Sequence, residues 1–64
     1  MIVNGEKTAW RPDLTIQELL NQKNCRTDRV AVEKNGEIVP KKEYSTEIIL
    51  EEDTIEIVTF VGGG

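Results

Sequence analysis

Several residue types that support catalysis or cross-linking are missing or scarce in this sequence. Its 64 residues include no histidine, the commonest acid–base and metal-ligating side chain. Cys25 is the single cysteine, which excludes an internal disulfide and a zinc site built from several cysteines. The sequence contains neither a phosphate-binding P-loop nor the dinucleotide-binding glycine pattern. We therefore expect no metal site, no catalytic residue and no enzymatic activity, and we interpret Cys25 as an incidental free thiol.

Positive charge and long apolar runs are scarce too. Twelve acidic residues outnumber 8 basic ones, which gives a formal charge of −4. Nucleic acids and anionic membranes require clustered basic residues, whereas Lys41-Lys42 is the one adjacent basic pair. No signal peptide or membrane-spanning stretch is apparent. We expect no nucleic-acid or membrane partner, a protein partner with a basic docking surface and, given the lone thiol, a cytoplasmic location.

Two Asn-Gly pairs, Asn4-Gly5 and Asn35-Gly36, divide the apolar segments of the chain. Asparagine and glycine tolerate the positive φ angles of a type I′ turn, so each pair predicts a β-hairpin. The predicted strands on either side of these turns cover residues 1–3, 6–10, 29–34 and 38–39.

A helix is predicted over Thr15–Lys23. Thr15 and Glu18 have the spacing of a capping box, in which each side chain accepts a hydrogen bond from the other residue's backbone N–H. Ile16, Leu19 and Leu20 follow with helical spacing and form one apolar face. Leu14 precedes the cap and is positioned to pack on Leu19.

The second half of the chain ends in the strongest strand signal, residues 54–61, which are rich in Ile, Val and Thr. Before it, residues 41–46 predict a turn or short helix, 48–50 an apolar segment that packs beneath it, and 51–53 a solvated turn. The first and last strands are the most apolar, so we expect both in the middle of the sheet, paired in parallel. The pattern predicts an α+β fold in which a sheet covers one side of the helix.

Side chains alternate between the two faces of this last strand. Ile55 and Ile57 are expected on the core face. Val58 and Phe60 fall on the other face, where they form a candidate docking patch for a partner. An alternative is that Phe60 covers the sheet or folds onto a neighbour.

The chain ends in three glycines, residues 62–64, directly after this strand. A segment without side chains is thin enough to enter a narrow channel, and its α-carboxylate, with a pKa of about 3.5, is ionised at neutral pH. An ATP-using partner can adenylate such a carboxylate, after which a sulfur or nitrogen nucleophile displaces AMP. The alternative is a frayed end without function. The domain is expected over residues 1–61, with 62–64 as a flexible tail.

The segment VAVEKNGEIVP (residues 30–40), the ending IEIVTFVGGG (55–64) and the order of elements resemble the ThiS family. These are sulfur carrier proteins of bacterial thiazole (thiamin) biosynthesis. The resemblance covers essentially the whole chain. It implies a ubiquitin-like β-grasp fold, with a mixed four- to five-stranded sheet packed on one main helix.

The resemblance also implies a function and its residues. Gly64 would bear the carboxylate that becomes a thiocarboxylate, Gly63 and Gly62 would thread the partner's channel, and Phe60, Val61 and Val58 would contact partners. The implied partners are a ThiF-like adenylating enzyme that uses ATP and magnesium, a cysteine desulfurase system as sulfur source, and a ThiG-like thiazole synthase. No cofactor is expected on this chain. Rival interpretations are a MoaD-like carrier for molybdopterin synthesis, carriers for other thiolation reactions, a ubiquitin-like protein modifier, and a plain interaction domain.

Overall fold

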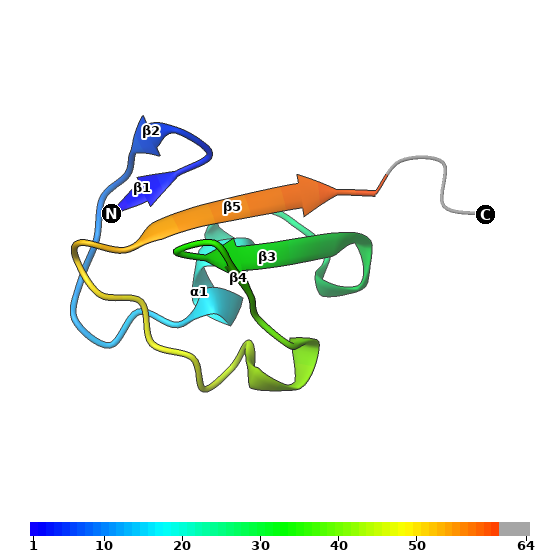
Figure 1. Ribbon diagram of the computed structural model, residues 1–64. Coiled ribbons are helices and arrows are strands. Elements are labelled where there is room, and N and C mark those ends of the chain that lie inside the picture. The colour runs from blue at the N-terminus through cyan, green and yellow to red at the C-terminus, as the bar shows by residue number, and fades with distance from the viewer. Residues whose placement is uncertain (61–64) are drawn as a thin grey trace.

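Residues 1–60, the part of the chain that the computed structural model describes, form a mixed sheet with one α-helix against it. Within these residues the sheet has five strands in the order β2-β1-β5-β3-β4. Figure 1 shows β5 in the middle of the sheet, with the β1–β2 hairpin beside it and α1 behind β3. The elements are β1 (Ile2–Val3), β2 (Glu6–Lys7), α1 (Ile16–Gln22), β3 (Val30–Lys34), β4 (Glu37–Ile38) and β5 (Thr54–Thr59), with short 3₁₀ turns at Thr27–Arg29 and Lys41–Glu43. The α+β class and the β-grasp arrangement are confirmed.

Both predicted Asn-Gly turns are present. The φ angles are 50° and 83° at Asn4 and Gly5, and 54° and 85° at Asn35 and Gly36, as a type I′ turn requires. The strand predicted over residues 6–10 is shorter, since β2 ends at Lys7. Beyond it, the Trp10 indole donates a hydrogen bond to the Ile49 carbonyl (2.9 Å), outside the sheet.

Helix α1 lies where the sequence predicts and is one residue shorter at each end. Thr15 Oγ1 accepts from the Glu18 backbone N–H (3.1 Å), and the Glu18 carboxylate accepts from the Thr15 N–H (3.1 Å), so the capping box is formed. Thr15 and Lys23 are the two cap residues, which accounts for the one-residue difference at each end. Leu14 and Leu19 are both fully buried, as expected for residues that pack around the helix start.

The two most apolar strands are adjacent and parallel, as predicted. β1 pairs with β5 in the register Ile2 to Thr54 and Val3 to Ile55, and β5 also pairs antiparallel with β3. β5 therefore has a strand on each side. The core lies between the sheet and α1 and consists of Val3, Leu14, Ile16, Leu19, Leu20, Val30, Val32, Val39, Tyr44, Ile49 and Ile55.

Two expectations for the segment before β5 are wrong. Of the apolar residues 48–50, Ile49 alone is buried, because an extended segment points successive side chains to opposite sides. The turn at 51–53 is not fully solvated, since the Asp53 side chain is buried, with 4% of the residue exposed. Its carboxylate accepts hydrogen bonds from the Leu50 N–H (2.8 Å) and the Asn35 amide (2.9 Å), which compensate for the lost hydration.

Candidate functional site

The C-terminal end of β5 is the place from which the predicted functional tail departs. The Phe60 N–H donates to the Arg29 carbonyl (2.8 Å), so β5 is still bonded to the β3 side of the sheet at the last described residue. Val61, Gly62, Gly63 and Gly64 lie outside the described residues. Their predicted roles, the thiocarboxylate on Gly64 included, stay predictions.

On the side of β1, the backbone of β5 is hydrogen-bonded to the side chain of Asn4. The Asn4 amide accepts from the Ile57 N–H (2.7 Å) and donates to the Ile57 carbonyl (3.3 Å), as a neighbouring strand would do. The Asn4 backbone N–H also donates to Ile55 (2.9 Å). β5 is thus hydrogen-bonded from both sides up to Ile57, and from the β3 side up to Phe60. The sequence marked Asn4 only as a turn residue.

The face of the sheet that points away from α1, called the open face here, presents apolar side chains beside that root. Val58 is 53% exposed and Phe60 49% exposed, while Ile55 is fully buried and Ile57 partly buried on the opposite face. The predicted alternation is confirmed. Phe60 is half exposed, and its contact with partners stays a prediction.

The register between the strands adds residues that sequence reasoning did not assign to this face. Val58 lies opposite Ala31, and Glu56 lies opposite Glu33. Ile38 lies opposite Glu33 on β4 and is 66% exposed, the largest exposed fraction among the large apolar residues described. Opposite residues of paired strands project to the same side, so these residues share one surface. Residues 37–38 form too short a strand for the sequence pattern to predict which face of the sheet Ile38 occupies.

At the start of β5, a network of hydrogen-bonded polar groups joins the strand to its neighbours. Asn35 donates to Asp53 and accepts from the Thr54 N–H (2.9 Å). Burial raises the pKa of Asp53, but the Leu50 N–H, the Asn35 amide and the Lys34 ammonium outweigh it and hold this pKa below its usual value. The hydrogen bond to Glu47 raises the pKa of Lys34 against the effect of burial. These groups are paired with one another, so the network serves the fold.

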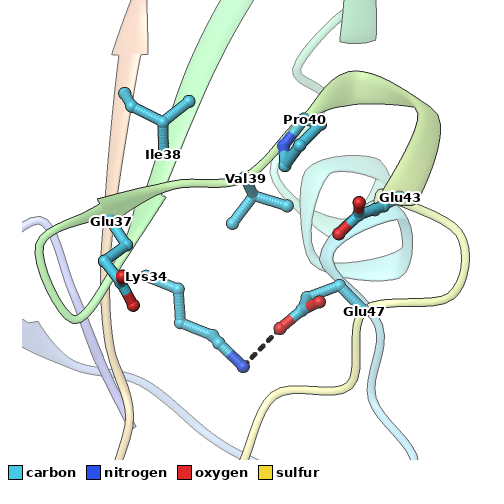
Figure 2. A pocket seen from close by; sticks show the side chains of 7 residues that line it. All are labelled: Lys34, Glu37, Ile38, Val39, Pro40, Glu43 and Glu47. Carbon is cyan, nitrogen blue, oxygen red and sulfur yellow. Dashed lines mark ion pairs between the residues drawn. The ribbon is translucent and has the colours of Figure 1, made fainter.

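A hollow of about 180 Å³ lies next to this network (Figure 2). Figure 2 shows the Lys34 ammonium paired with Glu47, with Glu37 and Glu43 on the walls. The hollow is smaller than the roughly 300–1,000 Å³ of a typical small-molecule site, and its lysine is already neutralised.

The remaining candidates for chemistry do not form a site within residues 1–60. Cys25 is partly buried against the core, and its Sγ lies 3.7 Å from the Lys23 carbonyl oxygen. No group of three His, Cys, Asp or Glu side chains that suits a metal ion occurs in this part of the chain. None of the helices there is long and apolar enough to span a membrane.

A model of the ThiS family matches residues 1–64, the entire sequence with its glycine ending. This chain belongs to the ThiS family. The sulfur carrier protein ThiS of Bacillus subtilis is 43% identical over 63 residues, which cover 97% of this chain and 96% of that protein. The crystal structure of a ThiS from Geobacter metallireducens superimposes with a TM-score of 0.79 at 30% identity, covering 98% of this chain and 96% of that one.

A larger relative contains a segment similar to the ThiS-family chain. A thiazole synthase of Paramagnetospirillum magneticum is 39% identical over 64 residues, which are all of this chain but 20% of the synthase. The chain thus spans about a fifth of the length of that relative.

Proposed function

We propose that this chain is the sulfur carrier protein of a thiamin (thiazole) pathway, with the carboxylate of Gly64 as the group that carries sulfur. The observation that carries the proposal is the family match, which extends through the glycine ending. The fold supports it, because β5 is hydrogen-bonded to the β3 side up to Phe60 and to Asn4 at Ile57, so the strand that precedes the tail is held in the sheet. The folded body positions the tail and is not itself an enzyme.

The chemistry takes place on the tail and is supplied by partners. A ThiF-like enzyme brings ATP and magnesium, and the carboxylate oxygen attacks the α-phosphorus, so that pyrophosphate leaves and an acyl adenylate forms. The outer sulfur of a persulfide, formed from cysteine by a desulfurase, then attacks the acyl carbon, and AMP leaves. A thiol of the partner system reduces the resulting acyl disulfide and leaves as a disulfide with the sulfur donor. The product is a thiocarboxylate.

A ThiG-like thiazole synthase is the proposed acceptor of the sulfur. One observation supports this acceptor. A protein of Paramagnetospirillum magneticum that is named thiazole synthase contains a segment similar to this chain. The open face supplies the contact surface, with Val58 and Phe60 next to the tail. We infer a cytoplasmic location, because the proposed cycle requires ATP and reduced thiols.

The decisive experiment is intact mass spectrometry after incubation with the ThiF-like enzyme of the same organism, ATP, magnesium and a sulfur donor. The expected product carries one sulfur in place of one oxygen on Gly64, located by fragmentation. A variant lacking Gly63 and Gly64 is the matched control and should stay unmodified. Unmodified wild-type protein under conditions where the partner hydrolyses ATP would refute the proposal.

The same experiment separates the rival functions. A protein modifier would appear in covalent adducts with larger proteins, and a plain interaction domain would remain unchanged. A MoaD-like carrier would also gain sulfur but would pass it to a molybdopterin synthase subunit and not to thiazole synthase. Membership of the ThiS family favours transfer to thiazole synthase.

Gly64→Ala tests how closely the tail must fit. A methyl group at the end of the chain should change the free energy of unfolding by no more than about 0.5 kcal/mol. It should nevertheless reduce the yield of thiocarboxylate, since a Cβ crowds a channel shaped for glycine. Comparing thermal unfolding with thiocarboxylate yield checks both statements. A large loss of stability with normal yield would contradict them.

A further inference from the structure

The two Asn-Gly turns have the same backbone geometry. The φ angles are 50° at Asn4 and 83° at Gly5, against 54° at Asn35 and 85° at Gly36. A glycine has no Cβ to shield its backbone nitrogen. In residues 1–60, no atom beyond the adjacent residues lies within 4 Å of the place that a Cβ would take at either glycine. Both turns therefore leave room for the glycine nitrogen to react with the preceding asparagine side chain, which releases ammonia.

Each asparagine is also hydrogen-bonded to β5 through its side-chain amide. The amide oxygen accepts from a backbone N–H in both turns, from Ile57 at Asn4 (2.7 Å) and from Thr54 at Asn35 (2.9 Å). The amide nitrogens have different acceptors. Asn4 Nδ2 donates to the Ile57 carbonyl oxygen over 3.3 Å, whereas Asn35 Nδ2 donates to the Asp53 carboxylate over 2.9 Å. The side-chain contacts of the two asparagines thus differ chiefly in the charge of this acceptor.

That acceptor matters because the amide nitrogen is the leaving group of the reaction. A hydrogen bond to an ionised carboxylate is shorter and stronger than one to a neutral carbonyl, so the Asn35 amide is held more firmly. Asp53 is itself fixed by the Leu50 N–H and is buried, with 4% of the residue exposed. Its negative charge also opposes the negative charge that develops on the Asn35 amide oxygen during attack. The Asn4 amide has no carboxylate partner among the hydrogen bonds of residues 1–60.

We propose that Asn4 is a site of spontaneous deamidation in the folded protein, and that Asp53 protects Asn35 from the same reaction. The Gly5 nitrogen loses its proton to solvent and forms a bond with the side-chain carbonyl carbon of Asn4. The bond from that carbon to Nδ2 breaks, and the nitrogen takes up a proton and leaves as ammonia. Water then opens the five-membered imide at one of its two carbonyl carbons, which leaves aspartate or isoaspartate at position 4. Water is the one co-reactant.

The products lose part of the contact between the first turn and β5. Neither has a side-chain N–H, so the Ile57 carbonyl oxygen loses the donor that Asn4 supplies. In isoaspartate the backbone of the turn is one carbon longer, and a two-residue turn sets the register between β1 and β2. Deamidation should therefore loosen the sheet beside the strand that precedes the tail. The inference concerns the folded body and does not depend on the proposed function.

The test follows both sites in one molecule. Wild-type protein is incubated at neutral and at mildly alkaline pH, and peptide mapping by mass spectrometry measures the replacement of the amide by a carboxyl group. The same incubation in urea gives the reference rates of the two Asn-Gly sequences without the fold. In the folded protein, after division by these reference rates, Asn4 should react roughly tenfold faster than Asn35 or more. The matched control is Asn4→Gly, which keeps the positive φ angle and should lose the fast reaction.

The consequence for the fold is measured on the product. The isoaspartyl form, separated by ion exchange, should melt about 4 °C or more below the unmodified protein. Asn35 reacting as fast as Asn4 in the folded protein would overturn the protection by Asp53. A folded Asn4 that stays intact while the urea-unfolded site reacts would overturn the site. An unchanged melting temperature would overturn the loosening of the sheet. Each of these results leaves the carrier function untouched, because none involves the glycine tail.

Discussion

The two ends of β5 differ in what surrounds them. At its start, Asp53 is buried and its carboxylate is bonded to Leu50 and Asn35. At its end, Val58 and Phe60 are about half exposed, and the strand leads into the glycine tail. One strand thus fixes the fold at its start and presents a surface at its end. Changes at the start should affect stability, whereas changes at the end should affect partners.

Asp53→Ala should produce the largest loss of stability. It leaves the Leu50 N–H and the Asn35 amide without their buried acceptor, which we expect to cost about 2–3 kcal/mol. Urea unfolding measures this. Asp28→Ala is the control, because Asp28 pairs with Arg26 on the surface and should cost less than about 1 kcal/mol. If Asp53→Ala lost no more free energy of unfolding than Asp28→Ala, the buried hydrogen bonds of Asp53 would contribute little to stability.

Acid should weaken the same end of β5. The pKa of Asp53 is lower in the folded protein than its unfolded value of about 3.9, so its contribution is present above that pH and is lost as the pH falls through the folded pKa. Urea midpoints measured from about pH 6 down to about pH 2 should fall more steeply for wild type than for Asp53→Asn, which has no proton to gain there. Parallel curves would exclude Asp53 as a source of acid sensitivity.

Substitutions of Asn4 test the hydrogen bonds between its side chain and Ile57 in β5. Asn4→Gly keeps the positive φ angle but removes both hydrogen bonds to Ile57, and should cost about 1 kcal/mol. Asn4→Ala adds backbone strain and should cost about 1 kcal/mol more. Chemical denaturation of the two variants separates the side-chain contribution from the backbone contribution. A neutral Asn4→Gly would mean that the amide contacts add nothing.

Phe60→Ala should have the smallest effect on stability, about 0.5 kcal/mol, because Phe60 is half exposed outside the core. Binding to the activating enzyme and to the synthase should fall much more. Leu50→Ala is the matched control, since Leu50 is 50% exposed but lies in the segment that precedes β5. Equal loss of folding and binding in Phe60→Ala would place the ring in the core.

Features that depend on neighbouring residues in the chain were predictable. The Thr15 and Glu18 cap, the helix that it starts and the two Asn-Gly turns follow from local hydrogen bonding and local backbone preference, and the structure shows all of them. The exposure of Val58 and Phe60 followed from alternation along a single strand. The glycine tail was recognisable from composition and from its place after that strand.

Features that join distant segments were not predictable. Nothing near Asp53 in the sequence shows that Asn35, 18 residues away, provides its hydrogen bond. The bond between Asn4 and Ile57 spans 53 residues. Ile38 and Glu33 join Val58 and Glu56 on one surface only because of the strand register.

The sequence by itself determined the helix, the turns, the faces of β5 and the family to which the chain belongs, since each depends on residues close together or on the pattern of the whole chain. The tertiary structure decided which polar groups are buried and which exposed residues share a surface. The physical reason is that burial and pairing depend on what lies opposite a residue, and in this sheet the opposite residue belongs to a distant part of the chain.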